Sequence, residues 1–194
     1  MSETGEVMTK GVVQPLQGVL PPIPTPYTGD TVDSAAMEAN VGRWMDTRVS
    51  GVVVLGSNGE APLLDEPESD AAIAAAREQV PSDRLCIVGV GRESTIGTIR
   101  AAKRASALGA DAVLARTPSF FKPLLTAEAF VSHYTAVADA SQVPVLLYNF
   151  TALTGVTLPV DVVSKLSEHR NILGIKESGS DLKYLSALVD HTRD

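Results

Sequence analysis

The 194-residue sequence contains a single cysteine, Cys86, which excludes an intramolecular disulfide and every multi-cysteine zinc site. Aromatic residues are also scarce, with one tryptophan, four tyrosines and four phenylalanines, so small aliphatic side chains must build the core. Basic residues are outnumbered, 16 against 23 acidic, and the net charge of −7 argues against a nucleic-acid-binding surface. The sequence has neither an apolar run of about 18 residues, as a membrane span requires, nor the pattern of a secretory signal. These absences predict a cytoplasmic protein that binds neither nucleic acid nor membrane.

The sequence does contain an alternation of short β-branched apolar runs with longer Ala-rich stretches of helical period, which is typical of βα units. The runs recur at intervals of roughly 30 residues and suit a parallel, fully covered sheet. Cys86 falls inside one run, where a buried and inert thiol is expected. Six strands are predicted: Val19–Pro24, Val52–Gly56, Leu85–Val90, Ala112–Thr117, Val143–Asn149 and Ile172–Lys176.

Helix starts are indicated between these runs by side chains that cap free N–H groups and by prolines that tolerate the first helical turn. The expected start residues are Asp33 or Ser34, Pro67, Thr126 and Pro159. Apolar residues at helical spacing are expected to face the core. Two such stripes are Phe130, Tyr134 and Val137, and Leu182, Leu185 and Leu188.

No linker divides the chain, so residues 17–194 are expected to form one domain after a flexible leader over residues 1–16. A (β/α)8 barrel, the TIM-barrel fold, needs roughly 250 residues. A barrel of this length would therefore be truncated after about six βα units. An open, doubly wound six-strand sheet is the alternative, and periodicity alone does not separate the two.

Ligands of parallel α/β folds bind at the carboxyl ends of the strands, and these ends are polar here. The second strand ends in Gly56-Ser57-Asn58-Gly59-Glu60, whose glycines allow a tight turn that presents N–H groups and a hydroxyl to an anion such as a carboxylate. An ordinary glycine-rich turn is an equal alternative. Gly89-Val90-Gly91 resembles the start of a dinucleotide fingerprint, but Ser94 occupies the third glycine position.

Lys176 and Tyr148 end neighbouring predicted strands. Alternation along the sixth strand places Ile172, Gly174 and Lys176 on one face. An amine in a low-dielectric interior favours its neutral form, which attacks carbonyls to form a Schiff base. A phenol beside it can relay protons to and from a substrate hydroxyl. The alternatives are a lysine that reaches solvent or pairs with Glu177, and a tyrosine that only packs.

Four motifs, taken in order and spacing from about Gly18 to the last residue, resemble the dihydrodipicolinate synthase and N-acetylneuraminate lyase superfamily. They are Gly56-Ser57-Asn58-Gly59-Glu60, Thr117-Pro118, Tyr148-Asn149 with Thr154-Gly155, and Gly174-Ile175-Lys176-Glu177-Ser178. The family consists of (β/α)8-barrel class I aldolases, commonly tetrameric, which need no metal or organic cofactor. The resemblance therefore implies a truncated barrel and a homo-oligomer.

The resemblance also implies a role for each matching residue. Lys176 would form the Schiff base with pyruvate or another 2-oxo acid, and Tyr148 would relay protons. Ser57 and Asn58 would hold the carboxylate of the 2-oxo acid, and Ser178 would contact the substrate.

The departures from the family pattern bear on the reaction. The synthases usually have Thr-Thr in place of Ser57-Asn58, and an arginine that grips the carboxylate of the aldehyde substrate in place of Leu153. The Gly-Ser-Asn-Gly-Glu form is similar to the 4-hydroxy-2-oxoglutarate aldolase branch. Where the family has Tyr-Tyr after Thr-Pro, this chain reads Ser119-Phe120-Phe121, and Phe120 cannot relay a proton to Tyr148.

The predicted function is therefore a class I aldolase that cleaves a 4-hydroxy-2-oxo acid, such as 4-hydroxy-2-oxoglutarate, into pyruvate and an aldehyde. The alternatives are a synthase-type condensation of pyruvate and a non-catalytic protein that binds 2-oxo acids. An open dinucleotide-binding sheet is a third alternative. The truncation itself is compatible with a fragment of a longer chain, a partner-completed barrel or an inactive remnant.

Overall fold

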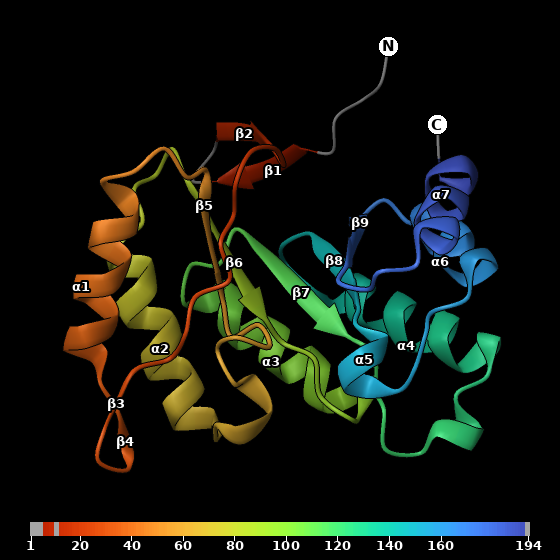
Figure 1. Cartoon of the computed structure of the whole chain (residues 1–194), viewed down its shortest axis with the longest axis horizontal. Coiled ribbons are helices and arrows are strands. Elements are labelled where there is room, and N and C mark those ends of the chain that lie inside the picture. The colour runs from red at the N-terminus through yellow and green to blue at the C-terminus, as the bar shows by residue number, and fades with distance from the viewer. Residues whose placement is uncertain (1–5, 10–11, 193–194) are drawn as a thin grey trace.

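The computed structural model describes residues 6–9 and 12–192 of the chain, and its central element is a five-stranded parallel sheet in the order β5-β6-β7-β8-β9 (Figure 1). The strands are β5 (Gly51–Val54), β6 (Leu85–Gly89), β7 (Ala112–Arg116), β8 (Val145–Asn149) and β9 (Ile172–Glu177). Each lies within one or two residues of a predicted strand, because short β-branched runs between turn residues suit buried parallel strands.

Helices connect the strands, and capping side chains set where most of them begin. The helices are α1 (Ser34–Met45), α2 (Glu66–Gln79), α3 (Thr95–Ala107), α4 (Ala127–Ala140), α5 (Thr151–Thr154), α6 (Val160–Ser167) and α7 (Leu182–His191), with 3-10 turns at Ala61–Leu63 and Lys122–Leu124. Asp33 accepts a hydrogen bond from the backbone N–H of Ala36, and Thr126 accepts one from Ala129. Both predicted caps are confirmed.

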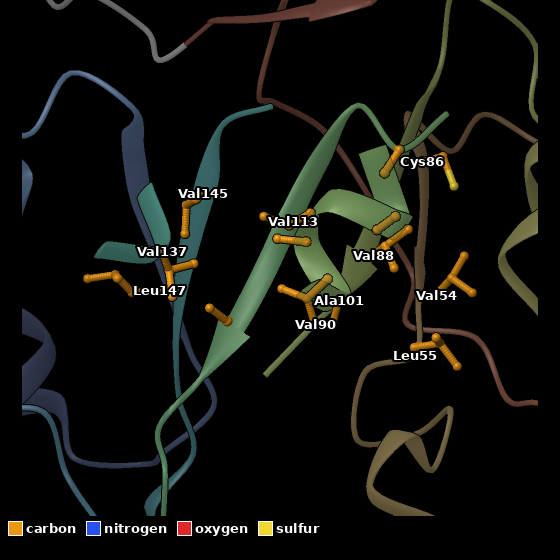
Figure 2. Packing of buried hydrophobic residues seen from close by; sticks show 14 of the residues in the cluster. Val54, Leu55, Cys86, Val88, Val90, Ala101, Val113, Val137, Val145 and Leu147 are labelled. Carbon is orange, nitrogen blue, oxygen red and sulfur yellow. The ribbon is translucent and has the colours of Figure 1, made fainter. Parts of the chain in front are cut away.

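The main apolar core lies between the sheet and its helices. One cluster joins strand residues such as Val88 and Val113 to Ala101 of α3 and Val137 of α4 (Figure 2). The same cluster contains residues of α1, α2, α6 and α7. A smaller apolar cluster on the opposite face is built from strand residues and their flanking segments. Because the helices share one face and the strand order never reverses, the doubly wound alternative is wrong.

The predicted first strand, Val19–Pro24, is reduced to a parallel bridge beside β5. Pro22 pairs with Val53, the backbone N–H of Val53 donates to Pro21 at 2.9 Å, and Ile23 donates to Val53 at 3.0 Å. Proline has no N–H for a strand ladder, so the three prolines of this segment prevent a regular strand.

The segment predicted as a flexible leader contains an antiparallel pair, β1 (Glu6–Thr9) with β2 (Val12–Pro15). Residues 1–5 and 10–11 of that segment lie outside the described residues, and its flexibility remains a prediction. A second short pair, β3 (Tyr27–Thr28) with β4 (Thr31–Val32), precedes α1. Within the described part of the chain, no helix is both long and apolar enough to cross a bilayer.

A bulge in β9 changes the predicted alternation of that strand. Its register against β8 shifts between Ile172 and Gly174, which leaves Leu173 unpaired. Ile172 packs in the helix-side core, whereas Leu173 packs on the opposite face. The prediction that Ile172 shares a face with Gly174 and Lys176 is therefore wrong, but Gly174 and Lys176 still share theirs.

The two predicted apolar stripes differ in burial. Phe130, Tyr134 and Val137 of α4 are buried as predicted. In α7 only Leu188 is buried, whereas Leu182 and Leu185 are 77% and 42% exposed, so the prediction of a core stripe there is wrong. An amphipathic helix buries only the side against which another element packs, and α7 packs mainly on α6.

The buried His133 of α4 makes stability depend on pH. Its Nδ1 lies 2.9 Å from Thr95 Oγ1, its Nε2 is buried without a partner, and burial lowers its pKa from 6.5 to about 4. The folded state therefore binds this proton less readily than the unfolded state, so stability is present above pH 6.5 and is lost as pH falls towards 4. We expect this group to lower the free energy of unfolding by about 2 kcal/mol as the pH falls from 7 to 5. Urea unfolding of the wild type and of His133→Gln at both pH values measures this loss of stability. An equal loss in both proteins would contradict the role of His133.

Candidate active site

The turn after β5 presents the predicted carboxylate-binding residues at one end of the sheet. Leu55 and Glu60 flank it with φ of 55°, and its centre closes through a hydrogen bond from the Gly59 N–H to Gly56. Thr25 fixes the turn from outside, because its Oγ1 donates to the Gly59 carbonyl at 2.7 Å. A side chain at Gly59 would press on the Leu55 backbone, so the glycine is required for close packing.

Tyr148 and Lys176 are register partners at the ends of β8 and β9. The Lys176 Nζ lies 4.6 Å from the centre of the Tyr148 ring, and Tyr148 is 6% exposed. The Tyr148 hydroxyl lies 3.0 Å from Ser57 Oγ, a contact that joins β8 to the turn after β5 across 91 residues of sequence. The fold thus gathers an amine, a phenol and an alcohol.

All five predicted site residues line one cavity of about 540 Å³. They are Ser57, Asn58, Tyr148, Lys176 and Ser178. The other lining residues are mostly aliphatic and come from the helix-free face of the sheet, including Val53, Ile87 and Leu114. The cavity therefore combines an apolar floor with a few polar groups, as small-molecule sites do.

The alternative in which Lys176 pairs with Glu177 is not what the structure shows. Glu177 Oε2 accepts a hydrogen bond from Asn149 Nδ2 at 2.6 Å, and its Oε1 accepts one from the Gly179 N–H. Among the described residues, Lys176 has no carboxylate at ion-pair distance. The amine is thus left free to meet a ligand in the cavity.

Asn149 is a positioning residue to which the sequence prediction gave no role. It is buried, its Oδ1 accepts from the Leu158 N–H at 3.0 Å, and its carbonyl accepts from the Ser178 N–H at 3.1 Å. With the Glu177 contact, these bonds fix the turn that carries Ser178. The available signal was its place directly after Tyr148 at a strand end.

The loop after β7 is held by Glu93, which the sequence prediction also missed. The Glu93 carboxylate accepts the backbone N–H groups of Ser119 and Phe120, each at 2.9 Å, and pairs with Arg116 at 2.9 Å. Partial burial opposes its ionised form, but these hydrogen bonds outweigh burial and lower its pKa. Phe120 is 76% exposed, so the hydroxyl beside Tyr148 is that of Ser57.

The geometry does not support a dinucleotide site at Gly89 to Ser94. A side chain at Gly89 would collide with the Leu55 carbonyl, and one at Gly91 with the Arg116 side chain. Ser94 caps α3 by accepting from the Gly97 N–H. These glycines thus serve packing between neighbouring strands. No group of three or more His, Cys, Asp or Glu side chains among the described residues could hold a metal ion.

Cys86 is completely buried in β6, and burial raises the pKa of its thiol to about 12. A thiol in this state is not a nucleophile at neutral pH. The prediction of an inert cysteine is confirmed.

One sequence-family model and two curated relatives each match most of this chain. The sequence model of the dihydrodipicolinate synthetase family matches residues 15–194. A 4-hydroxy-tetrahydrodipicolinate synthase of Methanosphaerula palustris is 35% identical over 181 residues, which cover 92% of this chain and 61% of the relative. A probable mitochondrial 4-hydroxy-2-oxoglutarate aldolase of Emericella nidulans is 40% identical over 165 residues, covering 82% of this chain and 53% of the relative.

Solved structures of the same family match the fold of this chain. A dihydrodipicolinate synthase matches with a TM-score of 0.86 at 32% identity, over 91% of this chain and 61% of that structure. YagE of E. coli K12, a member of the same family solved with pyruvate, matches with a TM-score of 0.86 at 30% identity, over 91% of this chain and 59% of its own. The chain thus spans about 60% of these proteins. The predicted fold class, a truncated (β/α)8 type, is confirmed.

Proposed function

Because this chain belongs to the dihydrodipicolinate synthetase family, we propose that it is a pyruvate-dependent class I aldolase. The observation that carries the proposal is the convergence of Lys176, Tyr148 and Ser57 on one cavity. Imine chemistry requires an amine, a proton relay and a polar group that orients the relay. Lys176 has no carboxylate at ion-pair distance among the described residues, its Nζ lies 4.6 Å from the centre of the Tyr148 ring, and Ser57 Oγ lies 3.0 Å from the Tyr148 hydroxyl.

The proposed reaction cleaves a 4-hydroxy-2-oxo acid, such as 4-hydroxy-2-oxoglutarate. The neutral Lys176 amine attacks the C2 carbonyl, and loss of water gives an imine. Tyr148 donates its hydroxyl proton to the imine nitrogen, and the resulting phenolate takes the proton of the C4 hydroxyl. The C3–C4 bond breaks, and its electron pair moves into the protonated imine to form an enamine. The aldehyde leaves, C3 of the enamine is protonated, and water releases pyruvate and free Lys176.

The remaining site residues act on binding in this proposal. The N–H groups and side chains of Ser57 and Asn58 hold the C1 carboxylate, since a tight glycine turn suits an anion. Ser178 contacts the same substrate from the other side of Lys176. The substrate partners are thus pyruvate and an aldehyde, and the proposed reaction needs no cofactor.

Condensation of pyruvate with an aldehyde, as in the synthases, is the second candidate. The names of several relatives favour it, including those from M. palustris and Stenotrophomonas maltophilia. Leu153 stands where the synthases carry an arginine, and the lack of that arginine favours cleavage.

The proposal also includes the assembly and the location of the protein, which we take to be a homo-oligomer, tetrameric as is common in the family, in the cytoplasm. The exposed Phe120 and Phe121 give the surface an apolar patch suited to subunit contact.

Borohydride trapping tests the proposal. The purified chain is incubated with pyruvate and reduced, and its intact mass and peptide map are then measured. The expected result is one adduct per chain, located on Lys176. A folded sample that forms no adduct, or forms it on another lysine, would overturn the proposed function.

Tyr148→Phe separates proton transfer from imine formation. The variant keeps the ring beneath Lys176 but lacks the hydroxyl bound to Ser57, so we expect kcat to fall by about 10²- to 10⁴-fold. The pyruvate adduct should form to the same extent as in the wild type. Discontinuous assays of aldehyde release measure cleavage, and borohydride trapping measures imine formation. Unchanged kcat would show that another group relays the proton.

A further inference from the structure

A second cavity, of about 310 Å³, adjoins the active-site cavity. The residues that line both cavities are Ser57, Leu114, Tyr148 and Phe150. A ligand held on Lys176 can therefore extend past Tyr148 into the second cavity. Among the described residues that line it, Arg116 is the only lysine or arginine, and Leu153 lies on its wall.

Arg116 belongs to the same row of the sheet as the catalytic pair. It is the register partner of Tyr148, which is in turn the partner of Lys176. Residues in register on adjacent strands point to the same face, and strands lie about 4.8 Å apart, so the Arg116 and Lys176 backbones are separated by roughly 10 Å. Two long side chains and a five-carbon substrate span that distance.

The guanidinium is held in place with donors to spare. Its Nη1 donates to Glu93 Oε1 at 2.9 Å and to the Thr117 carbonyl at 3.1 Å, and its aliphatic stem packs over Gly91. Nε and Nη2 have no hydrogen-bond partner among the described residues. An arginine offers five N–H donors in a planar fork, and its Nε and Nη2 edge matches the two oxygens of a carboxylate.

Glu93 does not occupy this free edge. Its Oε2 accepts the backbone N–H groups of Ser119 and Phe120, which turns the carboxylate towards the loop after β7. The Arg116 side chain is 22% exposed, so its positive charge is partly shielded from water and interacts strongly with a bound anion.

We propose that Arg116 binds a carboxylate at the far end of the substrate, so that the site selects 2-oxo dicarboxylic acids, such as 4-hydroxy-2-oxoglutarate, and an aldehyde partner that carries a carboxylate. The inference rests on the proposed function, since Lys176 must hold the other end. The cation of this subsite is thus Arg116 of β7, and Leu153 contributes only an apolar part of the cavity wall.

The experiment compares three probes in the borohydride trapping assay: pyruvate, 2-oxoglutarate and 2-oxohexanoate. The last two have chains of similar length and differ in their distal carboxylate. In the wild type, the concentration that gives half-maximal trapping should be lower for 2-oxoglutarate than for 2-oxohexanoate by about 10-fold or more, as expected for a charge-assisted bidentate pair. Arg116→Met should remove this preference and leave half-saturation by pyruvate unchanged.

Two further variants separate carboxylate binding from a structural role in the loop. Glu93→Gln breaks the same ion pair but keeps the cation, so binding by Arg116 predicts that the preference is kept or increased, whereas a structural role predicts the loss seen in Arg116→Met. Leu153→Glu leaves the ion pair intact and adds a negative charge to the wall, so it should weaken trapping of 2-oxoglutarate only. It also tests the inference if Arg116→Met fails to fold.

The outcomes are distinguishable. Wild type that is trapped by pyruvate but shows no preference for the diacid overturns the Arg116 inference alone. An undiminished preference in Arg116→Met, or parallel losses in Arg116→Met and Glu93→Gln, does the same. Wild type that no probe traps overturns the proposed function and this inference with it.

Discussion

Replacing Lys176 with methionine is expected to abolish the pyruvate adduct and to lower aldol cleavage by on the order of 10⁴-fold or more. Methionine fills a similar volume beside the Tyr148 ring but has no amine to form the imine. Without the imine, the electron pair of the breaking C3–C4 bond has no acceptor, and Tyr148 alone cannot replace it. Intact-mass measurement after borohydride reduction and an assay of pyruvate release provide the two readouts.

Lys183→Met is the matched control for this result. Lys183 is an exposed lysine of α7, six residues after the end of β9, and it does not line the active-site cavity. Its replacement should leave both adduct and turnover at wild-type levels. An adduct that persists in Lys176→Met and vanishes in Lys183→Met would move the imine to the helix and refute the proposed site.

Asp111→Ala is expected to destabilise the fold by about 3–5 kcal/mol, because it leaves a buried charge without its partner. Asp111 Oδ2 lies 2.7 Å from Arg77 Nη1, and the two side chains are only 7% and 11% exposed. The same oxygen accepts the backbone N–H of Cys86 at 2.8 Å. The change therefore removes an ion pair between α2 and the start of β7 and also orphans a buried N–H group. Urea unfolding at pH 7 measures the loss.

Two variants test the physical cause of this loss. Arg77→Met combined with Asp111→Leu removes both charges and should recover much of the stability, since a buried ion pair is often replaceable by apolar residues. Asp139→Ala, which removes an exposed partner of His169, should shift the unfolding midpoint far less. Equal shifts for Asp111→Ala and Asp139→Ala would show that burial does not govern the effect.

Local patterns predict most of the secondary structure of this chain. The runs that form β5 to β9 are continuous and apolar, and the caps Asp33 and Thr126 each accept from an N–H group three residues away. Such signals act within one turn or one strand, so the sequence displays them directly. Two of the failures have equally local causes, since three prolines interrupt the segment at 19–24 and a bulge at Leu173 reverses the predicted direction of the Ile172 side chain. The exposed side of α7 instead reflects how that helix packs on α6.

The candidate site is predictable in its residue types but not in all of its contacts. Tyr148 and Lys176 end successive parallel strands, so their proximity follows from the topology alone. The partner of the Tyr148 hydroxyl is a different matter. Phe120 stands where the family places a tyrosine, and only the folded chain shows that Ser57, 91 residues earlier, lies at hydrogen-bond distance.

The sequence by itself determined the α/β class, the order of the units and the positions of an amine and a phenol at strand ends, because periodicity and turn chemistry are properties of neighbouring residues. The tertiary structure decided which face of the sheet the helices cover, and thereby excluded the doubly wound arrangement. It also decided that Glu177 accepts a hydrogen bond from Asn149, that no carboxylate in the described part of the chain pairs with Lys176, and that Arg116 lies in the same row as Tyr148 and Lys176. These contacts depend on strand register and on side chains distant in sequence, which periodicity does not encode.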